Sequence, residues 1–162
     1  MENKERAKFF NHTKIIAIDP GNNGGITIYS AKDKRVIESI KMPETPQEVL
    51  NFLRIYSFKS VCYLEKVQGL PGMSGGGMFT FGRGYGHLEM ALLCCKIPTV
   101  AVTPQKWQKE LQLGNRGNKT KTQWKNKLKA KAEQLFPYVK KITKATSDSL
   151  LILQYAKIKE KL

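Results

Sequence analysis

Residues 14–29, KIIAIDPGNNGGITIY, constrain the fold of this chain more than any other stretch. A run rich in isoleucine ends on Asp19, a turn made of proline, glycine and asparagine follows, and a second apolar run begins at Gly25. This pattern predicts two strands, at 14–19 and 25–30, joined by a tight turn. Asp19 stands where the first strand ends, and an aspartate there either caps the turn or binds a metal ion.

The rest of the chain alternates between apolar strands and amphipathic helices. Strands are predicted at 35–41, 60–65 and 97–102, and helices at 46–56, 87–95, 104–113, 119–135 and from about 146 to the C-terminus. The segment 66–86 is too rich in glycine for regular structure, so it is predicted as a loop. This order of elements predicts an α/β fold with a mixed sheet and helices on its faces, in one domain at 14–162 after a short extension at 1–13.

The chain is strongly basic. Its 162 residues include 28 Lys and Arg against 13 Asp and Glu, a formal net charge of +15. Positive charge at this density indicates a polyanionic partner, either nucleic acid or an anionic membrane surface. No stretch approaches the roughly 18 apolar residues of a membrane-spanning helix. The three cysteines lie in apolar runs, so we expect buried free thiols and an intracellular, reducing setting.

Three acids differ from the others, which lie among polar neighbours. Asp19 and Glu65 each end a predicted strand, and Asp148 lies in the first turn of the last helix. Any one alone has a structural explanation, as a strand-end cap or as a complement to the helix dipole. If the first and fourth strands are neighbours, however, their carboxyl ends meet at one edge of the sheet. Converging carboxylates suit Mg²⁺ or Mn²⁺, and a pair of such ions activates water for phosphodiester hydrolysis. A basic chain with this acidic cluster is therefore predicted to be a nuclease.

At this point the sequence resembles a known family. The segments IIAIDPGNNGG, VCYLEKVQ and KATSDSLLILQYA resemble the acidic motifs of the RuvC-type Holliday junction resolvases in the RNase H-like superfamily. The segments GGGMFTFGRGYGHLEMAL and VAVTPQKWQKEL are similar to the phage-encoded and organellar branch. The resemblance implies a mixed five-stranded sheet flanked by helices, and a homodimer that cuts four-way and other branched DNA. It also implies action in the bacterial cytoplasm as a phage-encoded protein, or else in an organelle.

The same resemblance assigns the site. It implies that Asp19, Glu65 and Asp148 are the catalytic metal ligands, for two Mg²⁺ or Mn²⁺ ions. The family usually has a further acid or a histidine a few residues before the last carboxylate, but residues 143–147 here are TKATS, and Ala145 stands where an aspartate would fit. Either three carboxylates suffice, or Lys144 supplies positive charge there, or the chain is a catalytically impaired junction-binding protein. An actin-like kinase is a further alternative, because IDPGNNGGIT is similar to the phosphate loop of that class, but the chain is too short for it.

Two segments are predicted to handle DNA. In the stretch 69–86, glycines allow close approach to DNA, Phe79 and Phe81 are candidate wedges between bases, and Arg83 is a candidate phosphate contact beside Tyr85. The alternative is that these aromatic side chains fold onto the core. The second segment, 114–144, is strongly basic, and a run of this kind is either a solvated helix face or a phosphate-binding surface. Its one-sided charge favours phosphate contact, with the candidates Arg116, Lys119, Lys121, Lys125 and Lys144. Trp107 and Trp124 are predicted to pack in the interior.

Overall fold

Three consecutive strands form one half of a mixed sheet. In the computed structural model, which describes residues 12–67 and 74–162, β1 (Lys14–Asp19), β2 (Gly25–Ser30) and β3 (Arg35–Lys41) pair antiparallel in sequence order. On the other side of β1, β4 (Ser60–Glu65) and β5 (Thr99–Val102) are added in parallel, so the strand order is β3-β2-β1-β4-β5. β1, β2 and β4 are buried on both faces, which explains their nearly continuous apolar sequences.

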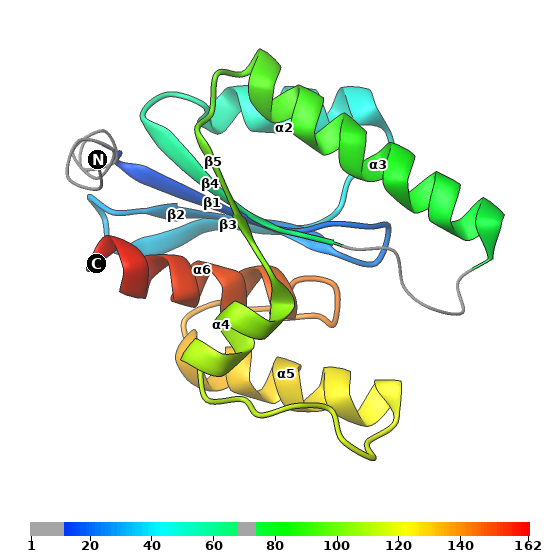
Figure 1. Cartoon of the computed structure of the whole chain (residues 1–162). Helices are drawn as coiled ribbons and strands as arrows, with labels where there is room; N and C mark the ends of the chain where they lie inside the picture. The colour runs from blue at the N-terminus through cyan, green and yellow to red at the C-terminus, as the bar shows by residue number, and fades with distance from the viewer. Residues whose placement is uncertain (1–11, 68–73) are drawn as a thin grey trace, which may run out of the picture.

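Helices cover both faces of this sheet (Figure 1). They are α2 (Pro46–Tyr56), α3 (Gly75–Cys94), α4 (Pro104–Glu110), α5 (Lys121–Leu135) and α6 (Ser147–Glu160). Figure 1 shows α2 and α3 on one face and α6 on the other, with α5 packed on the outer side of α6. Successive side chains of a strand point to opposite faces of the sheet, so β1 contributes to two apolar clusters. Ile15 and Ala17 enter the cluster under α5 and α6, whereas Ile16 and Ile18 enter the cluster under α2 and α3.

The predicted α/β class and all five predicted strands are confirmed, but the predicted loop at 66–86 is wrong over its second half. α3 begins at Gly75, and the Ser74 hydroxyl accepts a hydrogen bond from the Gly77 backbone at 3.2 Å. Glycine costs a helix about 1 kcal/mol per residue, and this cost suggested a loop. The opposing signal is the helical spacing of Phe81, Tyr85 and Leu88, which places all three toward the core. The remaining part, 68–73, lies outside the described residues.

Smaller differences follow from local geometry. α4 ends at Glu110 rather than 113, because Gln112 adopts a left-handed conformation with φ of 53° and the Leu113 backbone donates back to the Gln108 carbonyl. Of the thiols expected to be buried, Cys62 is buried but Cys94 is exposed. Of the predicted extension at 1–13, residues 1–11 lie outside the described part. Within the described residues, no helix is both long and apolar enough to cross a membrane.

Candidate active site

The three predicted carboxylates meet at one edge of the sheet. β1 and β4 are parallel neighbours in which Ile18 pairs with Leu64, so Asp19 and Glu65 are the next residues on adjacent strands. α6 packs across β1 and β2 and brings Asp148, in its first turn, to the same edge. Asp148 and Glu65 lie close enough to Asp19 to raise the pKa of its side chain, and Asp148 also raises the pKa of Glu65. The sequence-based grouping of these acids therefore agrees with their positions in the structure.

Gly24, in the turn between β1 and β2, and Gly25, the first residue of β2, have no room for a side chain. A Cβ atom at Gly24 would lie 2.0 Å from the Asp19 carbonyl oxygen, and one at Gly25 would lie 2.7 Å from the Ala145 carbonyl oxygen. Gly25 is also the partner of Asp19 in the β1–β2 register. Gly24 thus allows the tight turn after Asp19, and Gly25 allows the chain before α6 to approach the end of β1. Ala145 therefore lies beside this turn, at the position where the resemblance to RuvC-type resolvases leads us to expect a further acid.

Buried hydroxyl groups fix the start of α6. The hydroxyls of Ser149 and Thr27 lie 2.8 Å apart and share a hydrogen bond that links α6 to β2. The Ser147 hydroxyl donates to Asp148 Oδ1 at 3.0 Å. All three hydroxyl residues are fully buried. Our sequence analysis missed this network, although two serines flanking an acid inside an apolar segment were a signal that the helix start is buried.

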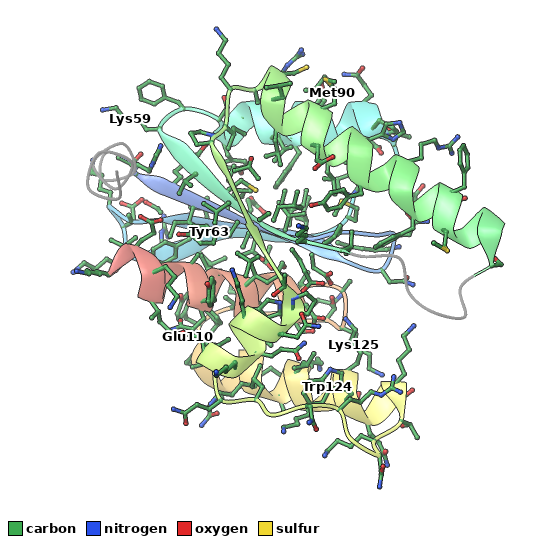
Figure 2. All side chains as sticks on the ribbon, in the orientation of Figure 1. Lys59, Tyr63, Met90, Glu110, Trp124 and Lys125 are labelled. Carbon is green, nitrogen blue, oxygen red and sulfur yellow. The ribbon has the colours of Figure 1, made fainter. Side chains whose placement is uncertain are left out.

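Lys125 occupies an unexpected position. It was predicted as a DNA contact, but its Nζ donates to Asp148 Oδ2 at 2.5 Å and lies 4.0 Å from Asp19 Oδ2. Figure 2 shows Lys125 on the side of α5 that faces the sheet. The exposed part of its side chain is 28 %. Lys144, the lysine that the sequence suggested for this role, is exposed. Lys125 instead supplies the positive charge inside the carboxylate cluster.

Trp107 holds the second carboxylate. It is 1 % exposed, as predicted for a packing residue, and its indole Nε1 also donates to Glu65 Oε2 at 2.8 Å. The Thr-Pro start of α4 directly after β5 brings this ring beneath the end of β4. A buried indole N–H requires an acceptor, so Trp107 both packs the core and orients one oxygen of Glu65.

The electrostatics of the cluster show excess negative charge. Burial raises the pKa of Asp19 well above its ordinary value, and the carboxylates of Asp148 and Glu65 raise it further. Burial, with help from Asp148, raises the pKa of Glu65 to about 7, despite the opposing hydrogen bond from Trp107. Burial alone would lower the pKa of Lys125, but the three carboxylates together raise it. The cluster therefore favours bound positive charge.

Carboxylate oxygens are the donors that Mg²⁺ and Mn²⁺ prefer, so the chemistry of this donor set fits a divalent ion. In the arrangement seen here, no three Asp, Glu, His or Cys side chains among residues 12–67 and 74–162 converge closely enough to hold a metal ion together. The ammonium group of Lys125 instead contacts two of the three carboxylates. Metal binding would thus require the side chains around Lys125 to rearrange.

The aromatic wedge candidates lie on α3 rather than on a loop. Phe79 is 70 % exposed, and the Arg83 guanidinium lies 6.0 Å from the centre of its ring. Phe81 is half-buried and packs against the β1–β2 turn, because a Cβ at Gly21 would lie 3.0 Å from its ring. Tyr85 is half-buried and packs on the apolar cluster under α2 and α3. Of the three aromatic candidates, only Phe79 is largely free to contact DNA.

The remaining phosphate-contact candidates are surface residues. They are Arg116, Lys119, Lys121 and Lys144, and all four are exposed. Trp124 on α5 is buried, as predicted, and belongs to the apolar cluster under α5 and α6. DNA contact by these basic residues stays a prediction.

Comparison with family models and with curated proteins finds no match. Solved structures do match. RuvC of Thermus thermophilus in complex with a Holliday junction substrate is 15% identical, with a TM-score of 0.63 over 90% of this chain and 96% of that chain. A structure of Thermus thermophilus RuvC alone is 17% identical, with a TM-score of 0.59 over 91% of this chain and 97% of that chain. The mixed five-stranded sheet flanked by helices, predicted from the sequence, is therefore the fold of RuvC.

Proposed function

We propose that this chain is a structure-selective endodeoxyribonuclease that resolves four-way (Holliday) junctions and other branched DNA by metal-dependent phosphodiester hydrolysis. The observation that carries the proposal is the meeting of Asp19, Glu65 and Asp148 at the edge of a RuvC-like sheet. One structure with this fold holds a Holliday junction, which supports branched DNA as the substrate. The net charge of +15 fits a polyanionic substrate.

Each part of the site has a role in this proposal. Asp19, Glu65 and Asp148 would hold Mg²⁺ or Mn²⁺, which activates a water molecule and stabilises the leaving oxygen when it is bound. Trp107 orients Glu65 through its 2.8 Å hydrogen bond. Lys125 would place positive charge beside a bound phosphodiester, a role supported by its contact with Asp148. Phe79 is the candidate for stacking on unpaired bases near the exchange point.

A second candidate function is junction binding without cleavage. Two observations favour it: Ala145 provides no fourth acid, and the Lys125 ammonium already contacts Asp19 and Asp148. A protein of this kind would keep the fold and the basic surface, and would bind junctions without cutting them. Cleavage therefore has to be tested separately from binding.

The test is cleavage of a labelled, immobile four-way junction with Mg²⁺ or Mn²⁺, with the same arms as linear duplex for comparison. We expect paired symmetric nicks that disappear in Asp19→Asn and persist in Glu44→Gln, a matched change at an exposed acid. Tight junction binding without nicks, with cleavage appearing only in Ala145→Asp, would support the second candidate. Equal binding of junction and duplex would refute both.

We further propose that the chain acts as a homodimer, because a two-fold assembly fits a two-fold substrate. The outer side of α3 supports this proposal: Met90 and Leu93 are 58 % and 69 % exposed, and Figure 2 shows Met90 on the surface. A monomeric mass by light scattering would refute it. On the sequence motifs, we also propose the phage-encoded and organellar branch, with the bacterial cytoplasm as the first choice of setting.

A further inference from the structure

The end of the sheet opposite to the carboxylates carries a short loop that exposes an aromatic ring. This loop, residues 57–59, joins α2 to β4, and its Phe58 is 73 % exposed. The backbone N–H groups of Thr13 and Lys14 both donate to the Lys59 carbonyl, at 2.8 and 3.2 Å. Lys14 Nζ also donates to the Phe58 carbonyl at 3.0 Å. The loop is therefore fixed to the start of β1, and its ring is held out into solvent.

Basic residues gather around this ring. The ammonium groups of Lys14 and Lys59 lie 6.0 and 5.6 Å from the centre of the Phe58 ring. Lys96 is exposed just before β5, and β5 runs parallel to β4, so Lys96 lies at the same end of the sheet. The sequence has no acid in residues 49–64 or 90–109, and the segment AKDKR, which follows β2 at this end, has three cations against one acid. We call the following set the distal surface: Phe58, Lys14, Lys59 and Lys96.

The distal surface is separate from the candidate active site. It lies at the first residues of β1 and β4, whereas the carboxylates of Asp19 and Glu65 are on the last residues of the same strands. Each strand has six residues, which rise about 3.3 Å each, so the two places are roughly 20 Å apart. Figure 2 shows Lys59 and Lys125 well separated, with Lys59 at the other end of the molecule.

An exposed aromatic ring among cations fits an unpaired nucleotide. A base can stack on the ring while the phosphates on either side of it contact lysines. The bases inside a duplex are stacked on one another and are not available to the ring. The chemistry of the distal surface therefore favours a single strand over a duplex.

Two other occupants fit this surface less well. A second copy of the chain would bring two positively charged surfaces together, and like charges repel across an interface. An anionic membrane would be attracted, but membrane binding scales with the apolar area that is inserted. The exposed large apolar side chains of residues 54–59 are Ile55 and Phe58 alone, which is a small area.

We propose that the distal surface binds single-stranded DNA, with an unpaired base stacked on Phe58 and the neighbouring phosphates against the three lysines. This inference goes beyond the proposed function, since it does not depend on cleavage. Together with that function, it names branched DNA that carries a single-stranded arm, such as a fork or a flap, as a substrate class.

The test measures the binding of a labelled oligothymidylate of about 12 nucleotides by fluorescence anisotropy, with a chelator present so that nothing is cut. Phe58→Ala and Phe58→Leu should each weaken binding about tenfold, because leucine keeps an apolar side chain but offers no flat ring for stacking. Phe58→Trp should bind at least as tightly as the wild type. With 5-bromodeoxyuridine in the strand, ultraviolet light should crosslink it to the tryptic peptide 55–59.

The lysines are tested through salt dependence. Lys59→Met should lower the slope of log affinity against log salt concentration by about 0.7, the value for one phosphate contact on a single strand. The matched control is Lys109→Met, which removes the same charge from an exposed position on α4 and should leave the slope unchanged. An equal change of slope in the two variants would overturn the inference, because the effect would then come from total charge.

Three further results would overturn the inference. Wild-type affinity in Phe58→Ala or in Phe58→Leu would exclude base stacking. Loss of binding to phosphatidylserine vesicles in Phe58→Ala, with unchanged binding of the oligothymidylate, would assign the surface to a membrane. A fall from a dimer to a monomer in Phe58→Ala, measured by light scattering, would assign it to a second copy. Circular dichroism checks that each variant is folded.

Cleavage, measured in parallel, separates this inference from the proposed function. Wild type and Phe58→Ala should cut a four-way junction with only duplex arms equally, whereas the variant should bind a fork with one single-stranded arm about tenfold more weakly. Single-strand binding that depends on Phe58, in a protein that cuts no branched DNA, would support the inference and overturn the proposed function. Normal junction cleavage with single-strand binding that does not depend on Phe58 would overturn the inference alone.

Discussion

Replacing Glu65 by glutamine should stabilise the metal-free protein at neutral and alkaline pH while abolishing cleavage. Burial raises the pKa of Glu65 from 4.5 to about 7, so the folded state resists ionisation of this side chain. Glutamine has nearly the same shape, carries no charge, and still accepts the 2.8 Å hydrogen bond from Trp107. The substitution therefore removes the cost of a buried charge and leaves the surrounding contacts in place.

The sign and size of the effect follow from proton linkage. Below pH 4.5, Glu65 is protonated in both folded and unfolded chains and costs nothing. Between pH 4.5 and about 7 the folded state binds more protons, so this side chain makes the free energy of unfolding fall as pH rises. Above pH 7, Glu65 is ionised in the folded state as well, and the full cost of burying its charge lowers the free energy of unfolding. The difference between about 7 and 4.5, at about 1.36 kcal/mol per pH unit, corresponds to at most about 3 kcal/mol.

Urea unfolding with a chelator present, at pH 5 and pH 8, measures this cost. We expect the gain in unfolding free energy of Glu65→Gln over wild type to be about 2 kcal/mol larger at pH 8 than at pH 5. The control Glu44→Gln, at an exposed acid, should change stability by less than about 0.5 kcal/mol at either pH. Equal effects of Glu65→Gln at both pH values, or a loss of stability at pH 8, would refute this account of the cluster.

Three further predictions concern the surroundings of the site. Gly25→Ala places a Cβ 2.7 Å from the Ala145 carbonyl oxygen, and it should lower the unfolding free energy by about 1–3 kcal/mol and reduce cleavage, both checked against wild type. Thr27→Val removes the 2.8 Å hydrogen bond to the buried Ser149, so urea unfolding should show a loss of about 1–3 kcal/mol. Phe79→Ala should leave the melting temperature unchanged, because the ring is 70 % exposed. It should weaken junction binding about tenfold in a gel-shift titration, and unchanged junction affinity would exclude a stacking role.

The strands and their terminal acids were predictable from the sequence because both depend on local pattern. β-branched runs bounded by glycine and proline mark strands, and parallel neighbours place their carboxyl ends at the same edge. Asp19 and Glu65 follow from these two rules alone. Asp148 required one more step, the placement of the start of α6 at that edge.

The role of Lys125 was not predicted, because the composition of its segment conceals it. Residues 114–144 contain many lysines, and a basic helix face usually contacts solvent or phosphate. The signal lay in the helical spacing instead. Lys125 precedes Leu128 by three residues and Ala132 by seven, so it belongs to the apolar side of α5 that packs on α6. A lysine on a buried helical stripe requires an acidic partner, and Asp148 is that partner.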